Sequence, residues 1–143
     1  LNNTHYLKHG LDRTTNVIFT GAKNIHDLPQ YLQHFDCVLI PFLCNQLTAS
    51  IYPLKINEYL AAGKAVVSTN FSEDIRSFQE VIYLAKNHEQ FVQLIDTAIA
   101  ENSVHKIQAR VAVANTNTWT ARVQQFWETV RPFLQQRSAK IPK

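Results

Sequence analysis

Short apolar runs alternate with segments of helical periodicity through the first half of the chain. Runs rich in β-branched residues predict four strands, at 16–21, 37–42, 65–68 and 81–84. The run 37–42 is apolar on both faces, which is typical of a strand in a parallel sheet covered by helices. Helices are predicted between the strands, beginning at Asp27, Pro53 and Ser72. Gly63 follows the second of these helices, at a position where glycine commonly ends a helix.

The second half of the chain predicts helices only, at 88–101, 104–115 and from 119 to about 136. Strands that alternate with helices indicate an α/β fold, in which an open parallel sheet of about four strands is flanked by helices. The predicted strands end in loops at Gly21, Phe42 and Thr69. In open α/β sheets, loops at the carboxyl ends of the strands form the ligand crevice.

Composition favours one compact domain, because the 143 residues are 45% hydrophobic and 17% charged. Disorder is excluded by the apolar content, and Pro41 interrupts the longest apolar run, which is far short of the roughly 20 residues of a membrane span. No secretory leader opens the sequence, so we expect a cytoplasmic protein.

The net charge of +3 is concentrated at the C-terminus, where five basic residues face only Glu128. They are Arg122, Arg131, Arg137, Lys140 and Lys143. One interpretation is a solvated helix end, whose cations suit the negative pole of the helix dipole. The other is a peripheral contact with a partner or with the inner face of a membrane. Nucleic-acid binding is not predicted, because the chain lacks a basic stripe with stacked aromatics.

Lys55 and Glu58 stand three positions apart in the first turns of the helix that begins at Pro53. They share a helix face just after a strand-to-helix loop, where unpaired N–H groups suit a phosphate. Lys55 could add a positive charge to a diphosphate, and Glu58 could accept two hydrogen bonds from the vicinal diol of a ribose. The alternative is an ordinary exposed Lys/Glu pair.

Four segments of the sequence together resemble a known family. They are Asn16-Val-Ile-Phe-Thr-Gly21, Leu28-Pro-Gln-Tyr-Leu32, Phe35-Asp-Cys-Val-Leu-Ile-Pro-Phe42 and Pro53-Leu-Lys-Ile-Asn-Glu-Tyr-Leu-Ala-Ala-Gly-Lys-Ala-Val-Val67. Their order and spacing closely resemble the nucleotide-sugar-binding domain of GT-B glycosyltransferases of family 4, the glycosyl transferases group 1 type. Asn117-Thr-Trp-Thr-Ala-Arg122 is similar to the closing helix of that family, so the likeness covers about 16–130. It implies a Rossmann-like sheet and a donor that is a nucleotide-diphosphate sugar.

The resemblance implies roles for matching positions. Glu58 matches the glutamate that binds the nucleotide ribose, and Lys55 matches a diphosphate contact. The loop of Gly21 and Lys23 matches the part that touches the base. Pro41 and Phe42 match the strand end that floors the site, and the stretch from Asn45 to Tyr52 matches the loop near the donor sugar. Simpler roles exist for three of these residues: a strand-end turn for Gly21, strand termination for Pro41 and loop packing for Tyr52.

The sequence departs from the family at the donor-sugar contact. The paired glutamates of the family stand eight positions apart, and Ser50 occupies the position eight before Glu58. We expect Ser50, Thr48 or Asn45 to replace the missing carboxylate, which leaves the sugar and the stereochemical outcome undefined. Since no Asp-x-Asp motif occurs, we expect neither a metal nor another cofactor.

The first 15 residues are too short for a β-α unit, so we interpret 1–15 as a remnant or linker and 16–143 as a truncated donor-binding domain. The resemblance implies a missing N-terminal domain that holds the acceptor. The whole enzyme would be a hexosyltransferase that acts on a polysaccharide or lipid-linked acceptor, and this chain alone would be inactive. The alternative is a non-catalytic nucleotide- or phosphate-binding module, or a degenerate paralogue.

Overall fold

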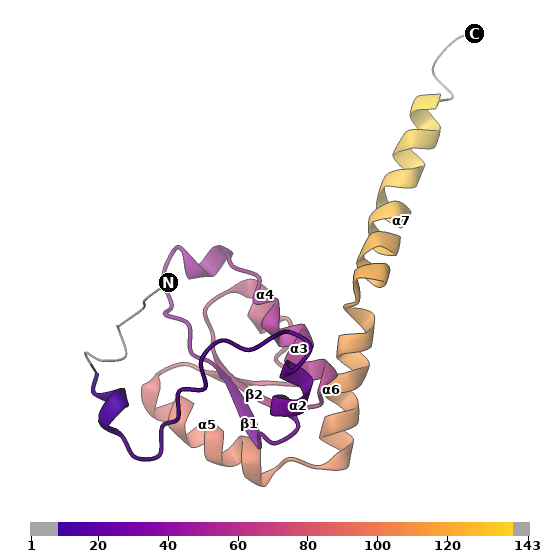
Figure 1. The fold of residues 1–143 in the computed structure, drawn as a ribbon. Coiled ribbons are helices and arrows are strands. Elements are labelled where there is room, and N and C mark those ends of the chain that lie inside the picture. Colours follow the sequence, from indigo (N-terminus) through magenta and orange to yellow (C-terminus); the bar gives the residue numbers. More distant parts are fainter. Residues whose placement is uncertain (1–8, 139–143) are drawn as a thin grey trace.

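Three parallel strands form an open sheet at the centre of the protein. The computed structural model describes residues 9–138 of the 143-residue chain. The sheet order is β1 (Cys37–Ile40), β2 (Ala65–Thr69) and β3 (Tyr83–Ala85) (Figure 1). Cys37 lies opposite Ala65, and Val67 lies opposite Tyr83. The predicted open α/β architecture, with helices after the last strand, is confirmed.

The helices follow the strands in the predicted order. They are η1 (Leu11–Arg13), α2 (Leu28–Leu32), η2 (Thr48–Ser50), α3 (Lys55–Ala61), α4 (Glu73–Arg76), α5 (His88–Ala100), α6 (Val104–Thr116) and α7 (Trp119–Ser138). The Ser72 hydroxyl accepts a hydrogen bond from the Ile75 N–H at 3.2 Å, so Ser72 caps α4 as predicted. Asp27 precedes α2, but its side chain makes no capping hydrogen bond.

The two faces of the sheet bury different helices. Val38, Ile40 and Val66 project from one face into the larger cluster, which includes residues of α3, α4 and α6. Ala65 and Val67 project from the other face against α5. Alternate residues of a strand point to opposite faces, so the continuous apolar run in β2 results from helices on both sides, whereas Leu39 of the edge strand β1 is 43% exposed.

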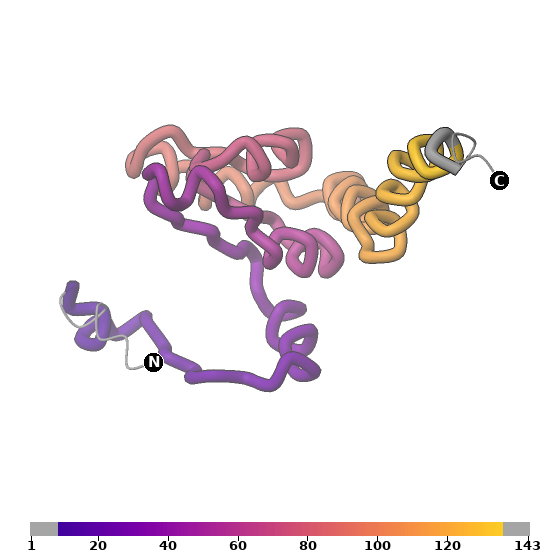
Figure 2. The backbone as a smooth tube through the Cα atoms, turned by 90° about the horizontal axis from the view of Figure 1, so that it is seen from above, coloured from indigo at the N-terminus to yellow at the C-terminus, as the bar shows by residue number. Residues whose placement is uncertain are grey.

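The strand predicted at 16–21 is not formed. Residues 16–20 are irregular and make no ladder with β1, β2 or β3, and Ile18 is 83% exposed. Figure 2 shows this part of the chain as an arm that stands apart from the sheet. A β-rich run becomes a strand only where a neighbour pairs with its N–H and C=O groups. The described sheet therefore has three strands instead of about four.

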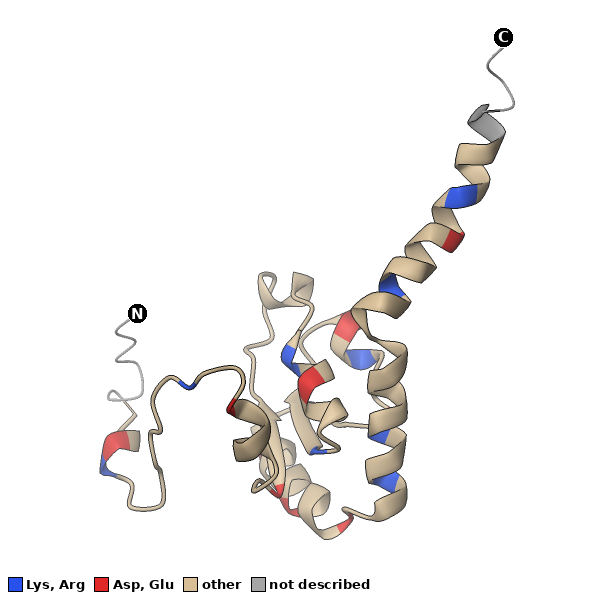
Figure 3. Ribbon diagram, turned by 45° about the vertical axis from the view of Figure 1, so that its right-hand side comes forward, with Lys and Arg blue, Asp and Glu red and all other residues tan. Residues whose placement is uncertain are grey.

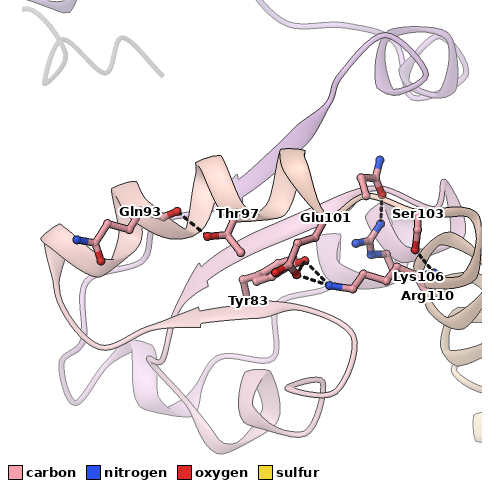
Figure 4. Close-up of polar contacts among 8 residues, drawn as sticks. Tyr83, Gln93, Thr97, Glu101, Ser103, Lys106 and Arg110 are labelled. Carbon is pink, nitrogen blue, oxygen red and sulfur yellow. Dashed lines mark hydrogen bonds and ion pairs between the residues drawn. The ribbon is translucent and has the colours of Figure 1, made fainter.

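A polar cluster joins β3 to the junction of α5 and α6. The Tyr83 hydroxyl donates to Glu101 Oε2 at 3.0 Å, and the Lys106 ammonium donates to Tyr83 at 3.0 Å and also to Glu101. These three side chains point toward one another in Figure 4. The hydrogen bonds from Lys106 and Tyr83 lower the pKa of Glu101, and the bond to Glu101 raises the pKa of Lys106. The cluster fixes the start of α6 beside the sheet.

Arg110 fastens α6 to the end of α3, the helix that carries Lys55 and Glu58. Its Nη1 atom donates to the Gly63 carbonyl at 3.1 Å and to Asn102 Oδ1 at 2.7 Å. The side chain is only 1% exposed, and burial lowers the pKa of the guanidinium. The bond to Gly63 holds the C-terminal end of α3 against α6, and the bond to Asn102 joins α6 to the segment after α5.

Helix α7 projects from the body of the protein (Figure 1). Within residues 9–138, no helix is both long and apolar enough to cross a membrane.

Candidate functional site

Pro41 and Phe42 end β1 at the carboxyl edge of the sheet. Pro41 has no N–H to donate to a ladder, which agrees with the end of the strand at Ile40. The Phe42 ring packs against Phe71 at a centroid distance of 4.7 Å, and the Thr69 hydroxyl donates to the Phe42 carbonyl at 2.6 Å. The segment after β1 is thus held against the end of β2 by one hydrogen bond and one ring contact.

The loop that follows is held by its own polar side chains. The Asn45 N–H donates to Thr48 Oγ1 at 3.1 Å, and the Thr48 N–H donates to Asn45 Oδ1 at 3.0 Å. The Thr48 hydroxyl also donates to the Leu43 carbonyl. The hydroxyl of Ser50 is exposed and makes no hydrogen bond to the part of the chain that the structure describes. Of the three candidates for the sugar contact, Ser50 therefore has the unused hydroxyl.

Lys55 and Glu58 lie on the outer face of α3. Ile56 and Leu60 of the same helix are fully buried, and this anchors the opposite face in the core. Both charged side chains are exposed, and neither joins an ion pair within residues 9–138. The alternative of an ordinary exposed Lys/Glu pair also predicts this exposure, although no ion pair joins the two side chains. Both groups are accessible to a ligand.

Glu58 borders a hollow of about 750 Å³ between α3 and the beginning of α7. Its walls come from α3, α4, α6 and α7 and from the segments that precede α3 and α7. The lining residues are Tyr52, Leu54, Asn57, Glu58, Ala61, Asp74, Ala114, Asn117, Thr118, Trp119 and Arg122. We call this feature the α3–α7 hollow. Of the predicted site residues, the structure brings Glu58 and Tyr52 together there.

The polar groups of the α3–α7 hollow suit a ligand with hydroxyl groups. Asn57 Nδ2 donates to the Tyr52 hydroxyl at 3.0 Å, which orients the phenol. Arg122 Nη2 donates to Asn117 Oδ1 at 2.7 Å. The carboxylates of Glu58 and Asp74 outnumber the single guanidinium, so the hollow accepts hydroxyl hydrogen bonds more readily than it binds a phosphate. A cation suited to a phosphate, Lys55, lies on α3 outside it.

Gly21 and Lys23 are not brought to this hollow. They lie on the arm that Figure 2 shows away from the sheet, and the Lys23 ammonium sits over the Tyr31 ring at 5.4 Å from its centroid. Gly21 has a φ of 67°, a conformation that favours glycine. The strand-end turn predicted as its simpler role is not found, because no strand ends there and residues 21–24 are irregular. Its part in base binding stays a prediction.

Several residues of the hollow were not predicted as site residues. For Trp119 and Arg122, the signal in the sequence is the likeness of the segment 117–122 to the closing helix of the family. Asp74 lies in the first turn of α4, the helix that follows β2 along the chain. The rule that ligands bind at the carboxyl edge of the sheet could have indicated it. Asn57 precedes Glu58 on α3, and no local pattern singles it out.

An open parallel sheet with helices on both faces is the architecture of the α/β class whose members bind ligands outside the carboxyl ends of the strands. The chain belongs to the family described as Glycosyl transferases group 1, whose model matches residues 2–101. It is 27% identical over 117 residues to TuaH of Bacillus subtilis (strain 168), whose name describes a glycosyltransferase of teichuronic acid biosynthesis. That alignment covers 79% of this chain and 30% of TuaH. No solved structure is significantly similar to the chain.

Proposed function

We propose that this chain is the donor-binding part of a glycosyltransferase that transfers a sugar from a nucleotide-diphosphate donor to a polysaccharide or lipid-linked acceptor. The observation that carries the proposal is the position of Glu58. Its side chain is exposed at the border of the α3–α7 hollow, which Asn57 and Tyr52 also line, on a helix whose opposite face is buried in the core. Membership of a glycosyltransferase family supports the same reaction class.

Glu58 and Lys55 contact different parts of the donor. The Glu58 carboxylate accepts both hydroxyls of the ribose, because an ionised carboxylate has only acceptors to offer. Lys55, one helical turn earlier, contacts the diphosphate as a compact positive charge. As the bond to the sugar breaks, negative charge grows on the departing diphosphate. A fixed cation stabilises that state more than the bound donor.

The acceptor belongs to a further domain in this proposal. The chain spans about 30% of the length of TuaH, and further chain of the whole protein would hold the acceptor. The exposed outer edge of the sheet supports a further packing partner, since β1 is an edge strand and Leu39 is 43% exposed. We propose that this chain alone is inactive as a hexosyltransferase.

A second candidate function is nucleotide binding without catalysis. Ser50 stands where the family has its other glutamate, so the contact to the donor sugar is altered while the ribose contact is retained. A non-catalytic module would bind a nucleoside diphosphate as tightly as the enzyme does. It would show no sugar transfer when the full-length protein is supplied with a donor and an acceptor.

We expect Glu58→Ala to weaken binding of UDP or GDP by about tenfold or more, because hydrogen bonds to a charged group contribute roughly 1.5–3 kcal/mol. Isothermal titration calorimetry of the chain measures the change. Glu89→Ala is the matched control, since Glu89 is an exposed glutamate in the first turn of α5 and lies outside the hollow. Equal affinities for the two variants, or loss of folding in Glu58→Ala alone, would contradict the proposed site.

We expect Lys55→Ala to weaken binding of the nucleoside diphosphate and to leave the binding of the nucleoside unchanged. The reason is that an exposed ammonium interacts with the phosphate charge and not with the ribose or base. Titrating the variant with UDP and then with uridine separates the two effects. A proportionate loss for both ligands would assign Lys55 a general structural role.

A further inference from the structure

Arg110 is a buried cation without a counter-ion in the part of the chain that the structure describes. Its side chain is 1% exposed, and its two hydrogen bonds go to neutral acceptors, the Gly63 carbonyl and Asn102 Oδ1. Arg110 joins no ion pair within residues 9–138. Taking a charge out of water is costly unless a charge of opposite sign compensates it. An anion beside the guanidinium would supply this compensation.

The unused edge of the Arg110 guanidinium has the geometry that recognises an oxyanion. Both hydrogen bonds that the side chain makes within residues 9–138 leave from Nη1, and Nε is buried without a partner there. The N–H groups of Nε and Nη2 form a planar fork, which matches the two oxygens of a carboxylate or of a phosphate group. A ligand with such a group would satisfy the Nε atom.

Arg110 lines a cavity of about 280 Å³ between α6 and the segment 79–83, which leads into β3. Lys106, one helical turn earlier on α6, lines the same cavity, and Figure 3 shows the Lys and Arg of this helix in blue. An apolar wall is formed by Val81, Ile82 and Ala109. Because most ligand sites have roughly 300–1,000 Å³, a cavity of this size suits a small molecule.

The charges around the cavity favour a ligand with a single negative charge. Lys106 is already balanced by its ion pair with Glu101, so Arg110 supplies the uncompensated positive charge. Glu80 also lines the cavity and would repel a ligand that carries several negative charges. A monocarboxylate satisfies both conditions, and its hydrocarbon part matches the apolar wall.

We propose that the cavity between α6 and the segment before β3 binds a small monocarboxylic acid, whose carboxylate accepts hydrogen bonds from Nε and Nη2 of Arg110. Nε is shielded from solvent, so the ligand enters when the Lys106 side chain moves aside. That side chain is 41% exposed, and its exposed ion pair with Glu101 costs little to open. The proposal is independent of donor binding, because this cavity shares no lining residue with the α3–α7 hollow.

The Nε–H group of Arg110 is itself the reporter of binding. Its resonance in a proton–nitrogen correlation spectrum is assigned through the carbons of the same side chain. We expect sodium propionate to move this resonance downfield in a saturable way, relative to sodium chloride at equal ionic strength. Acetate should bind about threefold more weakly, because it lacks a methylene group for the apolar wall. No saturable shift with either acid, or tighter binding of inorganic phosphate, would overturn the proposal.

Two leucine substitutions on α6 test the location of the site. Ala109→Leu fills the cavity without removing Arg110, so it should weaken propionate binding by about tenfold or more. Ala112→Leu, at an exposed position of the same helix outside the cavity, should leave the affinity unchanged. Far-ultraviolet circular dichroism verifies that both variants are folded. Equal affinities of the two variants would overturn the proposal.

The charge of the ligand is tested at Glu80. Glu80→Gln should strengthen propionate binding by about two- to threefold at low salt, because it removes a repulsive charge from the cavity wall. Weaker binding in this variant would contradict an anionic ligand. An Nε–H resonance of Arg110 that already lies in the downfield position before any acid is added would assign the fork to a carboxylate of the chain itself and would also overturn the proposal.

Discussion

Arg110→Ala is expected to lower the free energy of unfolding by about 3 kcal/mol, one of the two largest effects that we predict for a single substitution. Alanine removes two charge-assisted hydrogen bonds and leaves the Gly63 carbonyl and the Asn102 amide oxygen without this donor. It also opens a void where the buried side chain packed, because Arg110 is 1% exposed. Urea denaturation of the wild type and the variant measures the difference.

Two further variants separate the causes of this loss. Arg110→Met keeps the aliphatic stem but not the guanidinium, so it should retain part of the stability. Among buried side chains of residues 9–138, Arg110 Nε is the nitrogen without a hydrogen-bond partner, and methionine removes this cost as well. Arg131→Ala is the exposed control and should change the free energy of unfolding by about 0.5 kcal/mol or less. If Arg110→Ala is no more harmful than this control, the α3–α6 connection is not a stabilising feature.

Gly63→Ala is the second large effect, also about 3 kcal/mol of destabilisation. Gly63 has a φ of 68°, a conformation that costs an alanine about 1–2 kcal/mol. An added Cβ would also lie 2.8 Å from Ile107 Cγ2 on α6. Since this methyl group is attached directly to a β-carbon, it cannot swing away as the end of a flexible chain can. The end of α3 would have to move away from α6.

Gly21→Ala provides a matched control for the backbone strain. Gly21 has almost the same φ, 67°, and its Cβ position has no atom within 4 Å. Its replacement should therefore cost only the strain of about 1–2 kcal/mol, which is less than the loss expected for Gly63→Ala. The double variant Gly63→Ala/Ile107→Ala removes the clash and keeps the strain, so it should be less unstable than the sum of the two single variants predicts. Additive losses in thermal or urea unfolding would show that the close approach to Ile107 is unimportant.

Features determined by local chemistry could be predicted from the sequence. The apolar run from Cys37 predicts β1, in which Val38 and Ile40 are buried on one face while Leu39 on the other face is exposed. Ser72 caps α4, and Gly63 ends α3 with positive φ. Each of these depends on a few neighbouring residues, so a single sequence contains the necessary information.

Features that depend on distant partners could not be predicted. The β-rich run 16–21 has the composition of a strand, but pairing in a sheet is a tertiary property. Asp74, Trp119 and Arg122 reach the hollow of Glu58 only because α4 and α7 begin beside α3. Arg110 lies at a core-facing position of α6, three residues after Ile107 and four before Ala114. An arginine in that apolar pattern was the signal of a buried cation.

The most direct test of the donor site uses Trp119 as a reporter of the α3–α7 hollow. In a Trp127→Phe variant, the remaining tryptophan lies in the wall of that hollow and is 80% exposed. We predict that UDP or GDP changes its fluorescence in a saturable way, and that Glu58→Ala in the same background abolishes the change at equal ligand concentration. A nucleotide that binds by calorimetry without altering the Trp119 emission, or an unaltered response after Glu58→Ala, would contradict the assignment of Glu58 and its hollow to donor binding.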